Sequence, residues 1–194
     1  MPDAPPNARS RLLGAAIESF AAKGFHGTTT RDIASTAGMS PAAVYVHHKS
    51  KEELLYLISK EGHERTLRLV DEGIASSPGP VAQLRTVMRA FAAHHARGHT
   101  GARIVNYELA ALNADHLAEI TEYRRAIEQR MRDLVTAGVA AGVFTTSNPR
   151  MTALALLSLG IDVARWYRDE GDWTPEDIAD HYCELALRMV GATQ

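Results

Sequence analysis

Cysteine is almost absent from this sequence: Cys183 is the one cysteine among 194 residues, so no disulfide can form within the chain. A chain of this size without disulfides suits a reducing compartment, and we expect a cytoplasmic protein. The sequence also lacks an uncharged apolar run long enough to cross a bilayer, and its polar, proline-rich start has no signal-peptide core. We therefore expect no membrane partner.

An excess of basic charge is missing as well, since the formal net charge is −2. The charge is uneven, however: residues 1–51 contain six lysines and arginines but three acidic residues. A basic end on an otherwise acidic chain fits a local contact with a polyanion such as DNA. Uneven solvated charge without any partner explains the same numbers.

The alternation of apolar and polar residues that marks strands is not found, whereas apolar residues recur at helical spacing throughout. Breaks rich in glycine, proline and serine separate these periods. The pattern predicts an all-α fold of about nine helices, with residues 1–7 as a disordered arm. The expected helices are 8–23, 30–37, 41–47, 51–75, 80–97, 101–112, 115–142, 150–169 and 175–191.

Three helix starts are crowded into residues 28–54. Thr29 and Ser40 are typical N-cap residues, and Gly38 lies in the short break between the two helices that they begin. Helices this short are marginal alone, so they must be held by one another. The arrangement predicts a helix-turn-helix motif, whose second helix enters the DNA major groove. A simple helical hairpin is the alternative.

Candidate DNA contacts follow from this motif. Small residues at the start of its second helix allow close approach to bases, and hydroxyl and guanidinium groups nearby can add direct readout. Aromatic and basic residues that follow can meet phosphates, although packing of Tyr45 into the small core is an alternative. The candidates are Thr29, Thr30, Arg31, Ser40, Pro41, Ala42, Ala43, Tyr45, His47, Lys49 and Lys51.

The stretch GFHGTTTRDIASTAGMSPAAVYVHHKSKEELL, residues 24–55, resembles the DNA-binding signature of the TetR family of transcriptional regulators. The resemblance extends over residues 8–60, with one departure: His48 stands where that family usually has an aromatic residue, most often phenylalanine. The resemblance implies a DNA-binding domain at residues 8–55 and a helical ligand-binding and dimerisation domain at 56–194. It also implies three partners: double-stranded operator DNA, a small-molecule effector and a second copy of the chain, joined through the last two helices.

The expected helix at 150–169 is apolar on all sides, so it must be covered on two sides. The subunit core can cover one side and a twin subunit the other, which gives a four-helix bundle with the last helix. A core helix of a monomer is the alternative. The candidate interface residues are Leu154, Ile161, Trp166, Ile178, Tyr182, Leu185 and Met189.

Two charged residues lie beside apolar stripes and need partners: Glu108 and Arg124. They can pair with each other, or Arg124 can extend into solvent; alternatively, Arg124 meets the anionic group of a ligand with an apolar body. The candidate ligand contacts are Met88, Phe91, Ile104, Tyr107, Tyr123, Arg124, Met131 and Leu157. The segments NYELAAL and ARWY resemble C-terminal domains of family members that sense fatty acyl-CoA or related lipid thioesters.

No pattern in the sequence indicates catalysis or a cofactor. His95 and His99 have a spacing that can bind a transition metal, but with His94 they lie near an expected helix end, where solvated histidines are the simpler interpretation. We therefore expect neither an enzyme nor a metal site. The expected function is a homodimeric repressor released from DNA by an apolar or amphipathic ligand, such as an acyl-CoA. Alternatives are an efflux or detoxification regulator that responds to an aromatic or cationic drug-like ligand, and a helical carrier bundle that does not bind DNA.

Overall fold

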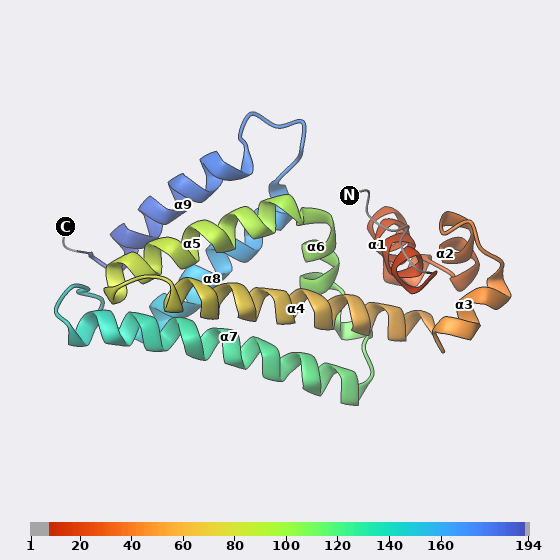
Figure 1. The fold of residues 1–194 in the computed structure, drawn as a ribbon, viewed down its shortest axis with the longest axis horizontal. Coiled ribbons are helices and arrows are strands. Elements are labelled where there is room, and N and C mark those ends of the chain that lie inside the picture. The colour runs from red at the N-terminus through yellow and green to blue at the C-terminus, as the bar shows by residue number, and fades with distance from the viewer. Residues whose placement is uncertain (1–7, 193–194) are drawn as a thin grey trace.

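The structure is a computed structural model that describes residues 8–192; the arm expected at residues 1–7 lies outside this range. The described chain contains nine α-helices, one 3₁₀ helix and no strand, which confirms the all-α prediction (Figure 1). The elements are α1 (Ala8–Gly27), α2 (Thr30–Thr36), α3 (Pro41–His47), α4 (Lys51–Ala75), α5 (Gly79–Arg97), α6 (His99–Tyr107), η1 (Leu109–Ala111), α7 (Ala114–Ala140), α8 (Pro149–Trp166) and α9 (Pro175–Met189).

Three predicted helix ends were wrong by about three residues or more, and the others agree within about two. Helix α1 continues past residue 23 to Gly27, although Gly24 has a φ of 71° and bends it. Helix α6 ends at Tyr107 rather than at residue 112, because the chain passes into the 3₁₀ turn η1. Helix α8 ends at Trp166 because Tyr167 adopts an extended conformation, with a ψ of 142°.

Helices α1, α2 and α3 form a head at one end of the molecule, and α4 runs from it along the whole body formed by α5 to α9 (Figure 1). Helix α4 has 25 residues without a break, including at Gly62. A methyl group at Gly62 would lie 3.2 Å from Val105, so the glycine lets α4 and α6 pack closely. The predicted domain boundary after residue 55 falls inside α4 and stays a prediction.

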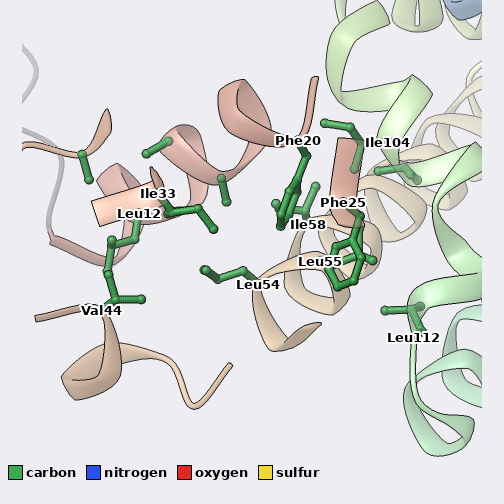
Figure 2. Close-up of a cluster of buried hydrophobic side chains, with 14 of the residues drawn as sticks. Leu12, Phe20, Phe25, Ile33, Val44, Leu54, Leu55, Ile58, Ile104 and Leu112 are labelled. Carbon is green, nitrogen blue, oxygen red and sulfur yellow. The ribbon is translucent and has the colours of Figure 1, made fainter. Parts of the chain in front are cut away.

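The head has a buried core that is continuous with the body (Figure 2). Each head helix contributes apolar side chains, α4 adds Leu54, Leu55 and Ile58, and the body adds Ile104 and Leu112. Burial of a side chain of this size contributes roughly 1.5–3 kcal/mol. The head is therefore held onto the body by shared apolar surface, in addition to the covalent link through α4.

A second buried cluster lies inside the body, where α4, α5, α7 and α8 pack against one another. Gly160 of α8 lies against Phe91 of α5: a methyl group there would come within 2.4 Å of the ring. Gly73 of α4 lies in the same way against Val87. Within residues 8–192, no helix combines the length and apolar character that crossing a bilayer requires.

Candidate DNA-binding face and effector cavity

Helix α2 begins at a complete capping box. The Thr29 hydroxyl accepts from the backbone N–H of Asp32, and the Asp32 carboxylate accepts from the backbone N–H of Thr29 at 2.8 Å. Lys23 also donates to Asp32 at 2.7 Å, and these bonds hold the pKa of the carboxyl well below its usual range, Lys23 contributing most. The capping box defines the start of a helix with only seven residues.

The turn between α2 and α3 is built around Gly38, whose φ of 64° favours glycine. The backbone N–H groups of Gly38 and Met39 donate to the carbonyls of Ser35 and Ala34. From α1, Arg11 donates to the carbonyl of Ala37 at 2.7 Å. The end of α2 therefore has partners for its carbonyl groups, and the direction in which α3 leaves the turn is well defined.

Helix α3 buries Val44 completely and leaves an outward face uncovered. Tyr45 is 59% exposed and Val46 77% exposed, so the alternative in which Tyr45 packs into the small core is wrong. The Tyr45 hydroxyl lies 3.1 Å from the Thr30 hydroxyl. Pro41 and Ala42 are also exposed at the start of the helix. The start of this face carries only small side chains, as close approach to base edges requires.

The other predicted DNA contacts lie around the same face. Ser40 is exposed, and its side chain caps α3 by accepting from the backbone N–H of Ala43, itself half-buried. Arg31, His47 and Lys49 are exposed on the same part of the head. Thr29 donates its hydroxyl proton to Asp32 at 2.5 Å, so its hydroxyl already has partners within the protein. The structure brings all of these residues together at α2, α3 and the loop that follows.

Lys51 has an internal partner that the sequence did not indicate. Its ammonium group donates to the carbonyl oxygens of Phe25 and Thr28, each at 2.7 Å, and lies 4.4 Å from the centroid of the Phe25 ring. Two of its three N–H donors are therefore used to join α4 to the end of α1. A phosphate contact by Lys51 stays a prediction and has the one remaining donor available.

His48 is buried inside the head, next to the exposed His47. Among the described side chains, its two ring nitrogens and the hydroxyl of Ser59 are the fully enclosed polar atoms that have no hydrogen-bond partner. Burial lowers the pKa of His48 and favours the neutral ring. An enclosed polar group without a partner costs stability, typically about 1–3 kcal/mol.

A cavity of about 600 Å³ lies in the body between α1, α4, α5, α6, α7 and α8. Its buried wall, which we call the inner wall, consists of Ile58, His63, Thr66, Phe91, His95, Val105, Ile127 and Leu157. Its exposed rim, which we call the mouth, includes Glu61, Arg65, Arg97, Arg124, Ser158 and Asp169. A volume of this size suits a drug-sized or short-chain lipid ligand.

Three of the eight predicted ligand contacts line the cavity: Phe91, Arg124 and Leu157. The other five do not line it. Met88 and Met131 are buried in the body cluster, and Ile104 is buried in the head cluster. Tyr107 is exposed, with its hydroxyl 3.5 Å from Asp162, and Tyr123 donates to Glu64 at 2.8 Å.

Glu108 and Arg124 do not pair with each other. Glu108 accepts from the backbone N–H of Phe25 at 3.4 Å, which links the end of α6 to the bend in α1. Arg124 donates to the side-chain oxygen of Asn106 at 3.3 Å and remains exposed at the mouth. Neither Arg65 nor Arg124 forms an ion pair with a described residue, so two guanidinium groups at the mouth are available to an anion.

The cavity also has residues that sequence reasoning missed, above all His63 and the α1 residues Leu13 and Ile17. For His63, the sequence contained some indication of burial. It lies four residues after Ser59, on the buried side of α4. The expectation of solvated histidines was wrong for His95, which is 4% exposed. Within residues 8–192, no group of three or more metal-ligating side chains comes together.

The predicted dimer residues differ in their exposure. Leu154 and Met189 are exposed, whereas Trp166, Tyr182 and Leu185 are half-buried, on α8 and α9. Ile178 packs inside the subunit and is 4% exposed, and Leu154 and Ile161 also line the cavity. Exposed Met151 extends the apolar surface of α8. These apolar side chains are typical of a surface that another protein covers.

Two family models match the chain. The model described as bacterial regulatory proteins, tetR family, matches residues 12–56, and the model described as Tetracyclin repressor-like, C-terminal domain, matches residues 77–190. The first covers the helix-turn-helix motif, and the second covers α5 to α9. Together they span the two parts of the molecule described above.

Similar proteins agree with these matches. The HTH-type transcriptional repressor KstR2 of Mycolicibacterium smegmatis is 28% identical, over 100% of this chain and 94% of its own length. A bacterial regulatory protein in the tetR family from Rhodococcus RHA1 is 42% identical, with a TM-score of 0.91 over 98% of this chain and 100% of the other. AibR, solved with isovaleryl coenzyme A and operator DNA, shares the fold, with a TM-score of 0.85, 23% identity and coverage of 96% and 100%.

Proposed function

The chain belongs to the TetR family of bacterial regulatory proteins, and from that premise we propose that it is a homodimeric repressor released from operator DNA by an amphipathic anion. Membership of this family makes the chain a DNA-binding regulator rather than an enzyme or a simple carrier bundle. The finer points, namely the dimer, the direction of regulation and the class of effector, are the proposal. We also infer that it acts in the cytoplasm, where its operator would be.

The outward face of α3 supports the DNA-binding part. Its small residues and exposed Tyr45 stand at the start and middle of the second helix of the motif. Arg31 and Lys49 flank this face, where Arg31 can read base edges and Lys49 can meet phosphates. Two such heads, related by a twofold axis, would read half-sites about 34–36 Å apart. The apolar surface of α8 and α9 is the proposed contact between the two copies.

The cavity supports the effector part, and it is the observation on which the ligand class depends. An apolar inner wall ends at a mouth where Arg65 and Arg124 have no acidic partner. Two lining carboxylates, Glu61 and Asp169, also lack a lysine or arginine partner, so the cavity offers unpaired groups of both signs at its mouth. Arg65 and Arg124 are the groups at the mouth that can bind the anionic end of an effector, and this is the class that we propose. AibR, with its isovaleryl coenzyme A, is a protein of the same fold that holds an acyl thioester.

The coupling that we propose passes through α1, α4 and α6 together. Leu13 and Ile17 bring the first helix of the head to the cavity, and Glu108 joins the end of α6 to the backbone of Phe25. A ligand in the cavity would therefore contact the head as well as α4. Release follows if the ligand binds one arrangement of the two heads better than the arrangement that fits DNA.

The DNA-binding part is tested with the DNA upstream of the chain's own gene, by fluorescence anisotropy at several salt concentrations. We expect tight binding whose affinity falls steeply with salt, because phosphate contacts release counterions. Arg31→Ala should reduce affinity, whereas Arg188→Ala, on an arginine at the far end of the molecule, should not. Salt-insensitive or absent binding, or a strict monomer in light scattering, would refute this part of the proposal.

The effector part is tested by adding short-chain and medium-chain acyl-CoA to the complex with DNA. We expect release of the DNA, and we expect Arg124→Gln and Arg65→Gln to raise the concentration needed by about tenfold each. Arg125→Gln, next to Arg124 but outside the lining of the cavity, is the matched control. Equal responses of all three variants would remove the proposed role of the mouth.

A further inference from the structure

The inner wall of the cavity carries three polar side chains among apolar ones: His63, Thr66 and His95. Each is at least nine-tenths buried, and each makes one hydrogen bond to a backbone carbonyl one turn earlier in its helix. Nδ1 of His63 lies 2.7 Å from the oxygen of Ser59, and Nδ1 of His95 lies 2.8 Å from the oxygen of Phe91. The Thr66 hydroxyl donates to Gly62 at 2.9 Å.

These bonds define which atoms carry the protons. A carbonyl oxygen can only accept, so Nδ1 of both histidines must be the protonated nitrogen. Burial lowers the pKa of both rings, that of His95 to about 4, so both are neutral near pH 7. A neutral imidazole with a proton on Nδ1 has a bare lone pair on Nε2. Nε2 of each ring is therefore a hydrogen-bond acceptor.

The two Nε2 atoms face the cavity. Neither has a protein partner, yet neither belongs to the fully enclosed unpartnered atoms of the described chain, which are found in His48 and Ser59. Both atoms therefore keep some accessible surface, and the cavity is the surface that these two buried residues line. The two rings are near each other, because His63 lowers the pKa of His95.

Hydrogen-bond donors are lacking on the same wall. The one proton of the Thr66 hydroxyl is already used, which leaves its oxygen as a third acceptor. None of the groups that can still donate lies on the buried inner wall: Arg124 and Ser158 are at the exposed mouth, and His94, Thr100 and Asn106 are half-buried. The buried inner wall thus offers hydrogen-bond acceptors, whereas the remaining donors, including two unpaired guanidinium groups, lie on half-buried and exposed residues of the lining.

We propose that the inner wall selects an effector whose apolar body carries a hydroxyl group, which donates to Nε2 of His63 or His95 while the anionic end stays at the mouth. This inference rests on the proposed function, since it assumes that the cavity holds the effector. A ketone, ether or carboxylate oxygen offers only lone pairs and would leave the Nε2 atoms without a partner. A hydroxyl group satisfies one of them and regains the hydrogen bond that the ligand loses on leaving water.

The test uses the full-length protein and isothermal titration calorimetry with three kinds of probe. The first is dodecanoate, the second a set of hydroxydodecanoates with the hydroxyl on different carbons, and the third their methyl ethers, which keep the oxygen but lose the donor. We expect at least one hydroxy acid to bind about tenfold more tightly than its ether and than dodecanoate. Equal affinities, or tighter binding of the ether, would overturn the proposal, as would binding of none of them.

Substitutions on the inner wall test whether its side chains cause the preference for the hydroxy acid. His63→Phe and His95→Phe keep a ring of similar shape but remove the acceptor, and Thr66→Val does the same for the hydroxyl. We expect the preference for the hydroxy acid over its ether to fall to about twofold or less in at least one histidine variant, while dodecanoate binding changes little. His181→Phe, on an exposed histidine of α9, is the control and should keep the preference. A preference that survives in all three wall variants contradicts the assignment.

A measurement on the unaltered protein avoids any effect of the substitutions on folding. In ¹⁵N-histidine NMR, we expect Nε2 of His63 and His95 to give the signal of an unprotonated nitrogen and to shift with the hydroxy acid but not with its ether. A proton on Nε2 in the free protein would overturn the inference. If the probes bind without preference and still release operator DNA, this inference fails and the proposed function stands. Failure to bind DNA at all refutes the proposed function instead.

Discussion

The head and the body both enclose histidine side chains, but the ring nitrogens have different hydrogen-bond partners in the two parts. In the head, His48 is buried with both ring nitrogens unpartnered. In the body, His63 and His95 each donate to a backbone carbonyl and keep the other nitrogen for the cavity. The head therefore carries a destabilising group inside a small core, whereas the body uses the same residue type to shape a binding site. A regulator needs this division, since a head that must shift should be less firmly held than the body that binds the signal.

Acidification should produce the largest effect in the body. Because burial lowers the pKa of His95 to about 4 from 6.5, the unfolded chain takes up a proton first as the pH falls. The stability that this ring contributes is complete above pH 6.5 and is lost progressively down to about pH 4, by about 3 kcal/mol. His48, His63 and His94, whose pKa values burial also lowers, act in the same direction.

Urea unfolding at a series of pH values measures this dependence. His95→Gln should flatten the curve below pH 6.5, whereas His181→Gln should leave it unchanged. A free energy of unfolding that stays constant or rises as the pH falls would contradict the assignment.

The next largest effect should come from the link between α1 and α4 at Lys51. Lys51→Met removes two charge-assisted hydrogen bonds to the carbonyls of Phe25 and Thr28, and we expect a loss of about 2 kcal/mol. Lys49→Met, on an exposed lysine two residues earlier, should cost less than about 0.5 kcal/mol but weaken DNA binding. Thermal unfolding measures the stability role of Lys51, and fluorescence anisotropy measures the DNA-binding role of Lys49. Equal stability of both variants would show that the hydrogen bonds of Lys51 contribute little.

Replacing the unpartnered ring of His48 in the head should raise the free energy of unfolding, whereas the two changes above lower it. We expect His48→Phe to stabilise the protein by about 1 kcal/mol, because a buried polar group without a partner is replaced by an apolar ring. The midpoint of thermal unfolding measures the gain. Destabilisation would mean that the pocket is too tight for phenylalanine, and His48→Leu would then distinguish shape from polarity.

The smallest effects should come from the two capping boxes, one in each part of the molecule. Thr29→Ala and Thr174→Ala each remove an N-cap, and we expect about 1 kcal/mol from each. The two variants should differ in function: loss of the α2 cap should also weaken DNA binding, whereas loss of the α9 cap should not. If both variants bind DNA normally, the cap of α2 is not needed to present α3.

The structure of the head could be predicted from the sequence, because the signals that define it are local. Caps such as Thr29 and Ser40, the glycine of the turn and the small residues of α3 act over a few positions, so the motif and its outward face could be predicted. The internal hydrogen bonds of Lys51 could not be predicted, because its partners lie 23 and 26 residues away and depend on how α1 meets α4. Only the packed tertiary structure brings such groups together.

The cavity was harder to predict, for a related reason. Helical periodicity identifies apolar residues such as Met88 and Met131, but it does not say which of them face a hollow and which face another helix. That choice is decided by close contacts such as that of Gly160 with Phe91. The histidines of α5 show the same limit, since burial of His95 depends on how α5 packs against its neighbouring helices.

The unbroken course of α4 has a geometric consequence. At 1.5 Å per residue, its 25 residues form a lever about 37 Å long. If the body end is held, a tilt of about 5° carries the other end through about 3 Å, which is close to a tenth of the spacing between neighbouring half-sites. A displacement of about 1–2 Å at the cavity, which α4 lines with residues 58 to 66, can thus become about 3 Å at the head, enough to move one of the two recognition helices out of its groove.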